Sequence, residues 1–376
     1  MNTLSMNELN ELNELIQRLD RKATRMVERI GDRSPHVAGK DGKYDDMRLC
    51  WWTSGFWPGL LWTMYDLTGR AHYKEAASGW DERIELRMLH PEHNFHHDVG
   101  FQFLPTAVAK FKRTADPDSL RRGLAAANFL AGRYNPVGKF IRAWNQDKLG
   151  WAIIDSTMNL SLLYWASRQT ADPRFSHIAS LHADSVLEHF IRPDGSVNHI
   201  VSFDPHTGAF IESLGGQGHG PHSSWSRGQA WALYGMANTF RYTGERRYLD
   251  AAKRVAHYFL ASLPNDGVAH WDFRATPLQD EPRDSSAAAI AASGLIEIAG
   301  QVTPEERDFY LNSAKRILSS LTNDYSSFDD PDHEAILLHA TGNKPTNENV
   351  DVSLIYGDYF YVEALAKLAG RDPGIF

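Results

Sequence analysis

The sequence predicts an all-helical (α/α)6 barrel, and three observations support this fold class. Six segments of the 376-residue chain share one layout: a polar motif, a largely apolar helix, a short turn and an amphipathic second helix. The segments start roughly 45–70 residues apart, which is too far for tetratricopeptide or ankyrin repeats. Helices that are apolar nearly all round are typical of an inner ring, and amphipathic helices are typical of an outer ring that covers it.

Each inner helix is expected to begin at a polar or aromatic motif and to end at a turn. The expected starts are Phe56, Gly100, Met158, Gly228, Ala287 and Gly357. The expected turns are Thr68-Gly69, Thr114-Ala115-Asp116, Thr170-Ala171-Asp172, Thr243-Gly244, Gly300 and Gly370. Glycine and aspartate turns of this kind separate one helix from the next. Each segment is therefore expected to form a helical hairpin.

The second helix of each hairpin is expected to be apolar on one side only. In the fourth repeat, the apolar residues between Tyr248 and Phe259 recur at helical spacing. The sixth repeat lacks a second helix, so the N-terminal segment is expected to supply the missing outer partner. That segment reads as an amphipathic helix with apolar residues at Leu9, Leu12, Ile16 and Leu19.

Two stretches are expected to form β-hairpins on the rim of the barrel. Residues 197–203 alternate apolar and polar side chains and run into a turn at residues 204–208. Residues 267–273 form the second expected strand.

Composition and charge exclude several classes of protein. The chain is 42% hydrophobic and 23% charged, as expected for a protein with a sizeable core. Its net charge of −8 argues against a general nucleic-acid partner. The single cysteine, Cys50, permits no intrachain disulfide and no Cys-based metal site. The sequence shows neither a signal peptide nor an apolar stretch of about 18 residues, so we expect a cytoplasmic protein without a membrane partner. We expect residues 1–376 to form one domain that is monomeric or weakly homo-oligomeric.

A polar or aromatic cluster precedes each inner helix. The clusters are residues 51–55, 96–100, 153–157, 223–227, 283–286 and 353–356. Because the inner helices of such a barrel run in the same direction, these six clusters are expected to meet in one concavity. Helix N-termini present unpaired N–H groups and positive dipole ends there. The sequence therefore predicts an aromatic-lined site that favours a negatively charged ligand.

Three aspartates stand at or near expected helix starts, where Asp is a favoured N-cap. Asp284 precedes two serines and is expected to cap its helix. Asp98 follows two histidines that no helix cap requires. Asp155 ends an apolar run, and either Ser156 or Thr157 could cap the helix in its place. Asp98 and Asp155 are therefore candidates for chemistry, with capping as the alternative for each.

The histidines and one arginine leave more than one interpretation open. His96 and His97 are adjacent, which makes them poor co-ligands, and we expect no metal site. His199 lies on the face of an expected strand, where a hydrogen-bonded core histidine is the default. Arg227 could pair with a protein carboxylate or act as a fork for a substrate carboxylate.

Seven motifs along the chain occur together in one known family. They are Trp52–Trp57, His96–Phe101, Ile153–Asp155 with Asn159, Trp225–Trp231, Trp271–Phe273, Arg283–Ala287 and Tyr356–Tyr359. At these residues the sequence resembles the unsaturated glucuronyl hydrolases of glycoside hydrolase family 88, and the resemblance covers essentially the whole chain. The fold that this resemblance implies is also the (α/α)6 barrel.

The resemblance implies an unusual glycosidase reaction that needs no cofactor. The substrate would be a disaccharide-sized oligosaccharide whose non-reducing end is a C4=C5 unsaturated uronic acid. Asp155 would protonate C4 and then activate the water that attacks C5, after which the hemiketal opens and releases the glycan. Burial beside the charge of Asp98 would keep Asp155 protonated beforehand. Asp98 would stay ionised and hold the sugar hydroxyls.

The resemblance also implies a set of substrate contacts. The expected ring-stacking residues are Trp52, Phe56, Trp144 and Trp231. The expected polar contacts are His97, His199, Gln217 and Arg227. Family members that act on sulfated fragments hold sulfate with a Ser- and Lys-bearing segment before the last helix. Here residues 343–349 contain one Lys and a nearby Glu, which favours unsulfated substrates.

Three alternatives remain open from the sequence. An unsaturated rhamnogalacturonyl hydrolase of family 105 would share the fold and chemistry, although Gln229 and the His-His-Asp motif favour family 88. A sugar 2-epimerase on the same barrel would use His97 and His199 as acid and base. A non-enzymatic helical scaffold would leave the six converging motifs unexplained.

Overall fold

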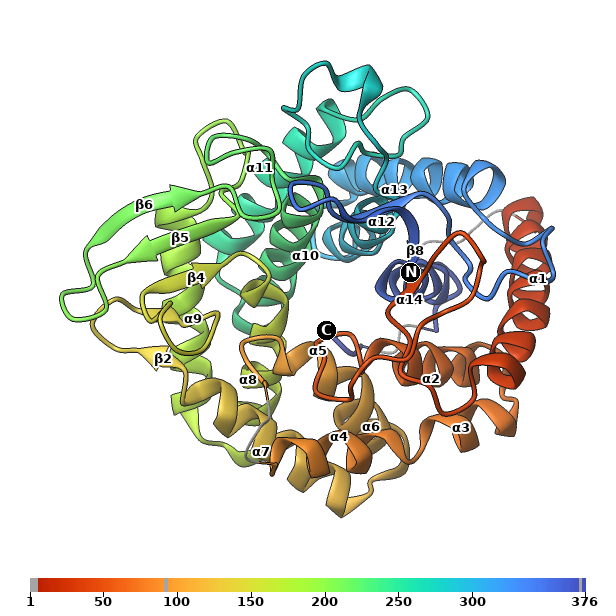
Figure 1. Ribbon diagram of the computed structural model, residues 1–376, viewed down its shortest axis with the longest axis horizontal. Helices are drawn as coiled ribbons and strands as arrows, with labels where there is room; N and C mark the ends of the chain where they lie inside the picture. Colours follow the sequence, from red (N-terminus) through yellow and green to blue (C-terminus); the bar gives the residue numbers. More distant parts are fainter. Residues whose placement is uncertain (1–5, 91–93, 372–373) are drawn as a thin grey trace.

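The computed structural model describes residues 6–90, 94–371 and 374–376, and within them it confirms the (α/α)6 barrel (Figure 1). The inner ring consists of α2 (Phe56–Thr68), the segment α5–η1–α6 (Val99–Phe103, Leu104–Val108 and Ala109–Thr114), α8 (Ser156–Thr170), α10 (Ser226–Thr243), α12 (Ser285–Ala299) and α14 (Ile355–Leu368). The outer ring consists of α1 (Met6–Ile30), α3 (Ala71–Ala77) with α4 (Trp80–Met88), α7 (Pro117–Ala131), α9 (Pro173–His189), α11 (Arg246–Ala261) and α13 (Pro304–Asp324).

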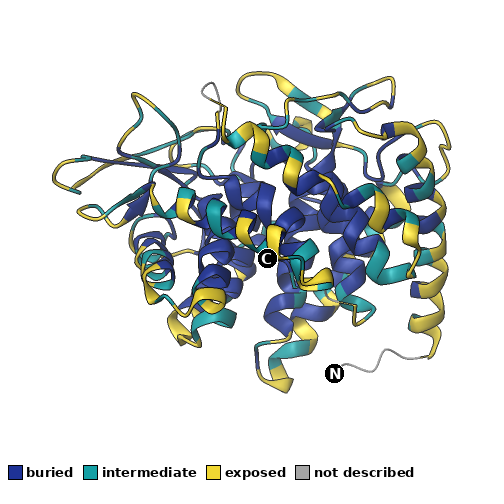
Figure 2. Ribbon diagram, turned by 90° about the horizontal axis from the view of Figure 1, so that it is seen from below, coloured by how far each residue is buried: buried dark blue, intermediate teal, exposed yellow. Residues whose placement is uncertain are grey.

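The inner helices form the core because they are apolar on nearly every side. Figure 2 shows buried residues concentrated in these helices and exposed residues along the periphery. Every residue of α12 except Ile296 is buried. Small residues let neighbouring inner helices approach closely: a Cβ on Gly235 of α10 would lie 2.5 Å from Thr157 of α8, and one on Gly294 of α12 would lie 2.5 Å from Leu233. Larger side chains at these glycines would push the inner helices apart.

The turns between paired helices follow the predicted chemistry. Ala115 and Ala171 end their helices with φ of 55° and 57°, in the left-handed region that closes a helix C-terminus. The next residues, Asp116 and Asp172, accept hydrogen bonds from backbone N–H groups in the first turn of α7 and α9. The repeated Thr-Ala-Asp sequence is therefore both a stop and a start signal.

The N-terminal helix is the missing outer partner, as predicted. Helix α1 lies at the edge of the barrel beside α13 and α3 (Figure 1). Lys315 of α13 donates a hydrogen bond to Glu8 at 2.6 Å, and Tyr73 of α3 donates one to Asp20 at 2.9 Å. These contacts join α1 to the outer helices of the fifth and first hairpins and so close the outer ring.

One inner helix is irregular, which the sequence analysis did not predict. The middle of the second inner helix, η1, is π-helical. Pro105 lies in this segment and has no backbone N–H, so it cannot complete an α-helical ladder. After the wider turn, the N–H of Ala109 donates to the carbonyl oxygens of Leu104 and Thr106.

The first predicted hairpin is confirmed, with a later start. Strand β5 (Ile200–Phe203) pairs with β6 (Phe210–Leu214) on one side and with β4 (Trp151–Ile153) on the other. Val197 forms only an isolated bridge with Ile191.

The second predicted hairpin is wrong. Residues 267–273 make isolated bridges, His270 to Arg283 and Trp225 to Asp272. Because these partners come from two different loops, no continuous ladder can form. Two further sheets were not predicted from the sequence. They are the sheet of β1 (Val37–Ala38), β8 (Glu348–Leu354) and β7 (Ala340–Asn343), and the short pair of β2 (Tyr134–Asn135) and β3 (Phe140–Ile141).

Within the described residues, no helix is both long and apolar enough to cross a bilayer.

Candidate active site

Hydrogen bonds connect the polar motifs at the starts of the inner helices. Asn159 of α8 donates to Asp98, which precedes α5. Arg227 of α10 donates to Asp284, which precedes α12. These contacts support the prediction that motifs far apart in sequence converge at one end of the barrel.

Asp98 is a buried carboxylate that does not cap its helix. It occupies the position before α5, but its side chain accepts no capping hydrogen bond. Its Oδ1 instead lies 3.0 Å from Nε2 of His97 and accepts from Nδ2 of Asn159 at 3.3 Å. Burial alone would raise the pKa of Asp98, but the charge and hydrogen bond of His97 lower it below the usual value. Asp98 is therefore the ionised carboxylate of the site.

His97 is the cationic partner of Asp98. Its Nδ1 lies 2.8 Å from the carbonyl oxygen of Ala143, so it donates a hydrogen there. Burial lowers the pKa of His97, but the charge of Asp98 and the hydrogen bond to it raise the pKa by more, so the net shift is upward. With both ring nitrogens directed at acceptors, His97 is suited to the imidazolium form.

Asp155 is the carboxyl group of the site whose pKa is raised. It is 8% exposed and precedes α8 without capping it. Neither neighbouring hydroxyl is the expected cap: Thr157 donates to the carbonyl of Ile154, and Ser156 Oγ has no hydrogen-bond partner in the part of the chain that the structure describes. Burial, and then the negative charge of Asp98, raise the pKa of Asp155 to about 7. A buried acid poised near neutral pH is suited to proton transfer.

Asn159 joins the two aspartates, and no role was predicted for it. It lies one turn after Asp155 on α8, and its Nδ2 donates to the Asp155 carbonyl at 3.1 Å as well as to Asp98. Its Oδ1 accepts from the backbone N–H of Phe101 at 2.8 Å. The i, i+4 spacing from Asp155 was the available sequence signal.

His199 faces Asp155 from the strand side of the site. Its Nε2 lies 3.9 Å from Asp155 Oδ1, and both atoms are buried without a hydrogen-bond partner among the described residues. Its Nδ1 accepts the backbone N–H of Gln217 at 2.9 Å. Burial lowers the pKa of His199 to about 3, so the ring is neutral.

Arg227 pairs with a protein carboxylate, which is the first of the two interpretations that the sequence left open. Its guanidinium donates to Asp284 and to the carbonyls of Thr341 at 2.6 Å and Gly342 at 2.6 Å. Asp284 also caps α12, as predicted. The Nε2 of Gln217 donates to the same Gly342 carbonyl at 2.9 Å. Arg227 and Gln217 thus hold the β7–β8 hairpin beside the site.

The predicted aromatic residues fall into two groups. Trp52 and Trp144 are partly exposed, and Trp144 lies edge-on to His97 with ring centroids 6.1 Å apart. Phe56 and Trp231 are completely buried. They belong to an aromatic cluster that includes Phe101, which lies 4.9 Å from Trp231 and 5.3 Å from Phe56. Phe56 packs under Trp52 with ring centroids 5.9 Å apart, whereas Trp144 packs against His97 and Trp151.

One group of metal-binding residue types lies within this site. Ligand atoms of His96, His97 and Asp98 lie within 4.8 Å of one another. The ring nitrogens of His97 are already engaged by Asp98 and the carbonyl of Ala143. A metal ion would have to displace that buried ion pair, so the arrangement favours the pair over a metal.

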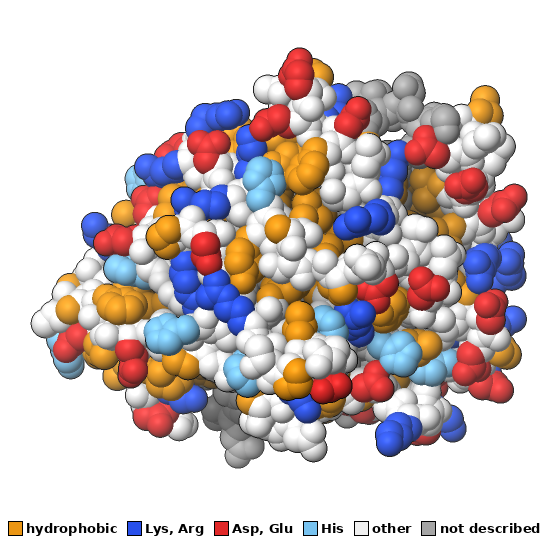
Figure 3. Space-filling view, turned by 90° about the horizontal axis from the view of Figure 1, so that it is seen from above, with side chains coloured by type: hydrophobic (Ala, Val, Ile, Leu, Met, Phe, Trp, Pro, Cys, Tyr) orange, Lys and Arg blue, Asp and Glu red, His pale blue; other side chains and the backbone are white. Residues whose placement is uncertain are grey.

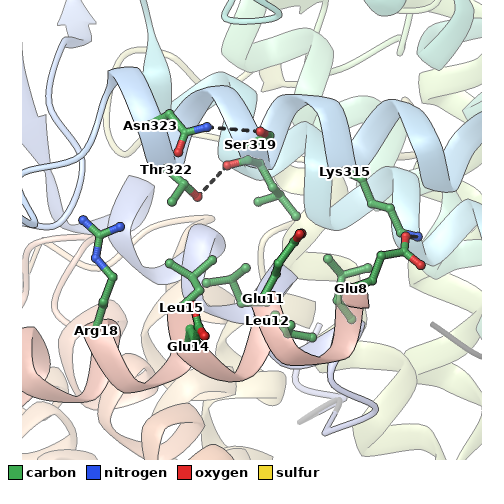
Figure 4. A pocket seen from close by; sticks show the side chains of 13 residues that line it. Glu8, Glu11, Leu12, Glu14, Leu15, Arg18, Lys315, Ser319, Thr322 and Asn323 are labelled. Carbon is green, nitrogen blue, oxygen red and sulfur yellow. Dashed lines mark hydrogen bonds and ion pairs between the residues drawn. The ribbon is translucent and has the colours of Figure 1, made fainter. Parts of the chain in front are cut away.

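A groove of about 550 Å³ elsewhere in the molecule is not this site. It lies between α1 and α13 and is lined by residues such as Glu11, Leu15 and Thr322 (Figure 4). It also reaches Leu365 and Leu368, at the C-terminal end of α14. The aspartates lie at the opposite ends of the inner helices.

Comparisons with known proteins agree with the fold. The model of Glycosyl Hydrolase Family 88 matches residues 19–364. The unsaturated glucuronyl hydrolase of Bacillus sp. (strain GL1) is 37% identical over 350 residues, covering 92% of this chain and 93% of that protein. The unsaturated chondroitin disaccharide hydrolase of Streptococcus pyogenes serotype M1 is 36% identical over 340 residues, with coverages of 89% and 85%.

Solved structures give the same result. The crystal structure of the Bacillus sp. GL1 unsaturated glucuronyl hydrolase matches with a TM-score of 0.91 at 36% identity, covering 95% of this chain and 96% of that one. A variant of the Streptococcus agalactiae enzyme in complex with dGlcA-GalNAc6S matches with a TM-score of 0.84 at 29% identity, with coverages of 98% and 93%. The chain therefore belongs to glycosyl hydrolase family 88.

Proposed function

We propose that this enzyme removes the Δ4,5-unsaturated uronic acid from the non-reducing end of small oligosaccharides by hydrating its C4=C5 enol ether. The observation that carries the proposal is the pairing of Asp155, a buried acid whose pKa is raised to about 7, with the ionised Asp98. An enol ether is hydrated by an acid that delivers a proton to carbon, and that acid must be protonated before the substrate reacts.

In the proposed reaction, Asp155 donates its proton to C4, and positive charge develops at C5 and the ring oxygen. The Asp155 carboxylate then removes a proton from the water that adds to C5, which restores the acid. The product is a hemiketal, whose ring opens to a ketone at C5 and releases the glycan from C1. One water is consumed in each cycle, and no external acid, base or oxidant is needed.

Asp98, His97 and Asn159 prepare this step. The negative charge of Asp98 keeps the Asp155 proton in place and stabilises positive charge at C5. His97 and Asn159 fix the orientation of Asp98 through hydrogen bonds to its Oδ1. The remaining acceptor capacity of Asp98 is available to sugar hydroxyls.

The remaining predicted residues provide the walls of the proposed site. Trp52 and Trp144 are proposed to stack on sugar rings, with Phe56 and Trp231 supporting them. His199, Gln217 and Arg227 are proposed to hold the polar groups of the uronic acid. Arg227 carries a positive charge near Asp155, and the converging helix N-termini add to the potential that attracts the substrate carboxylate.

The substrate is proposed to be an unsulfated glucuronyl oligosaccharide. Lys344 is the one basic residue of the 343–349 segment, and it lines an outer pocket together with Asp280, Glu281, Asp324 and Asp351. The second cation of that pocket, Arg283, is paired with Asp266 at 2.9 Å. Acidic neighbours of this kind disfavour a sulfate group beside Lys344. Sulfated and unsulfated forms of one disaccharide test this preference directly.

Residues 1–376 are proposed to act as one catalytic domain whose partner is a small oligosaccharide, in a monomer or weak homo-oligomer. Figure 3 shows Lys and Arg side chains interspersed with Asp and Glu on one side of the barrel. This mixed charge is consistent with a protein that has no nucleic-acid partner.

A panel of lyase-generated unsaturated disaccharides tests the proposed function. The conjugated enol ether absorbs in the ultraviolet, and hydration abolishes that absorbance. Decay with substrates from hyaluronan, chondroitin, gellan or xanthan is the expected result. Decay with the pectin-derived substrate alone would favour the rhamnogalacturonyl alternative. Absence of decay with every substrate would overturn the proposal.

A further inference from the structure

Asp272 is a completely buried carboxylate that the proposed reaction does not use. Its Oδ2 accepts the backbone N–H of His219 at 2.9 Å. Its Oδ1 accepts the N–H groups of Ser224 at 3.2 Å and Arg274 at 2.8 Å. One side chain therefore fixes both ends of the loop that follows the Gly215–Gly218 turn.

This turn packs against one edge of His199. The hydrogen bond from Gly218 N–H to the Gly215 carbonyl closes it at 2.8 Å. Gly216 has φ of 56°, and a Cβ there would lie 2.2 Å from His199 Nδ1. Between these glycines, the N–H of Gln217 donates to that Nδ1. The turn thus contacts the ring through a backbone donor.

The backbone donor determines the tautomer of His199. Nδ1 also lies 3.1 Å from the carbonyl oxygen of Gly215, so distance alone permits a hydrogen on Nδ1. However, a backbone N–H can only donate, and the 2.9 Å contact with Gln217 requires a lone pair on Nδ1. The hydrogen of the neutral ring is therefore on Nε2, the atom that faces Asp155.

The Asp272 segment also fixes the face of the His199 ring. Trp225, which pairs with Asp272 in an isolated bridge, lies against His199 with ring centroids 4.2 Å apart. Asp155 is the charged or titratable group that faces His199. The charges of Arg227 and His97 also act on the ring. Both the edge and the face of the ring are thus fixed by groups connected to Asp272.

We propose that Asp272 is a positioning residue for the hydration reaction. It acts through the Gly215–Gly218 turn, which holds His199 in the Nε2–H tautomer. That hydrogen is directed at Asp155 Oδ1, so the acid proton of Asp155 is kept on Oδ2, the oxygen left for the substrate. His199 Nε2 and Asp155 Oδ1 lie 3.9 Å apart. Catalytic hydrogen bonds are often this long before a substrate binds, and they tighten in the complex. This inference rests on the proposed function, because it assigns a role in the same reaction.

The first test is nuclear magnetic resonance of the enzyme labelled with ¹⁵N in its histidine rings. The two tautomers have different ring-nitrogen shifts, and the His199 signals are assigned by their loss in His199→Gln. The expected result for the wild type is a neutral ring with its hydrogen on Nε2. A hydrogen on Nδ1 would overturn the proposal. This readout needs no substrate, so it remains interpretable even if the proposed activity fails.

Asp272→Asn tests the connection to the reaction. In this variant an NH2 group replaces one carboxylate oxygen of Asp272. Because an NH2 group cannot accept the backbone N–H that this oxygen accepts, the loop and the turn should loosen. We expect a mixture of His199 tautomers and a kcat lowered by about 10- to 100-fold, with little change in KM. The basic limb of the kcat–pH profile should also move, because Asp155 loses a fixed donor. Unchanged tautomer, kcat and pH profile in the folded variant would contradict the proposal.

Two further variants separate positioning from folding. Asp358→Asn is the matched control, because Asp358 is also completely buried and its carboxylate accepts backbone N–H groups, from Ile336 and Leu337, beside the hydroxyl of Tyr44. It should lower Tm but leave the His199 tautomer unchanged. Gly216→Ala disturbs the contact with His199 directly while leaving Asp272 intact. It should reproduce the tautomer mixture, and an unaltered ring in this variant would contradict the role of the turn.

Discussion

The side-chain amide of Asn159 donates hydrogen bonds both to Oδ1 of Asp98 and to the backbone carbonyl of Asp155. The pKa values of the two aspartates nevertheless shift in opposite directions. Asp98 has its cationic partner His97 at 3.0 Å. Asp155 has no hydrogen-bond partner at Oδ1 among the described residues. The difference in partners explains how two buried carboxyl groups divide into an anion and an acid.

The first prediction concerns the pH dependence of kcat/KM. Asp155 must be protonated to act, and its pKa is about 7. Activity should therefore hold at mildly acidic pH and fall as pH rises through about 7. In Asp98→Asn the neighbouring negative charge is gone, so the fall in residual activity should move to lower pH. A wild-type optimum well into the alkaline range would contradict a protonated Asp155.

The second prediction concerns stability. The folded state keeps the Asp155 proton up to about pH 7, whereas an unfolded Asp loses it near its model value of 3.8. The stabilisation from this proton is therefore complete below about pH 4 and is lost as pH rises through about 7. Asp155→Asn should raise Tm relative to the wild type at pH 8 and make little difference at pH 4. Equal Tm differences at both pH values would contradict the raised pKa.

The third prediction concerns Asn159. Asn159→Ala removes the donor shared by the two aspartates and the acceptor for the Phe101 N–H. We expect kcat to fall by about 10- to 100-fold, the usual effect of losing a group that orients a functional residue. Circular dichroism should show the helical content retained. Wild-type kcat in this variant would show that the amide does not orient Asp98.

The fourth prediction separates the aromatic residues by exposure. Trp231→Ala removes a completely buried ring and should lower the free energy of unfolding by about 3–5 kcal/mol. Trp52→Ala removes a partly exposed ring and should mainly raise KM. Chemical denaturation and steady-state kinetics of both variants measure the two effects. A large KM effect without destabilisation in Trp231→Ala would reverse these roles.

The fifth prediction concerns the buried pair of Arg227 and Asp284. Arg227→Met leaves Asp284 without its charged partner and should destabilise the protein by about 3–5 kcal/mol. If Arg227 also holds the substrate carboxylate, Arg227→Lys should raise KM for the acid more than for its methyl ester. Equal KM changes for both substrates would assign Arg227 to structure alone.

The barrel could be predicted from sequence because its signals are local and repeated. The Thr-Ala-Asp turns and the apolar inner helices recur along the chain, and each repeat supports the others. The isolated bridges of residues 267–273 could not be predicted, because their partners come from two different loops, one before and one after this stretch. The capping role of Asp284 was predictable from the serines that follow it. The engagement of Arg227 by the carbonyls of Thr341 and Gly342 was not, because it depends on the β7–β8 hairpin that the sequence analysis missed.

The most direct test of the account follows two signals in one reaction: the ultraviolet absorbance of an unsaturated glucuronyl disaccharide and the release of its second sugar. If Asp155 hydrates the enol ether, absorbance should decay no later than the sugar appears, and Asp155→Asn should abolish both while remaining folded. The expected loss of rate is at least about 100-fold. Release of the second sugar while the absorbance persists, or full activity in Asp155→Asn, would contradict the hydration mechanism.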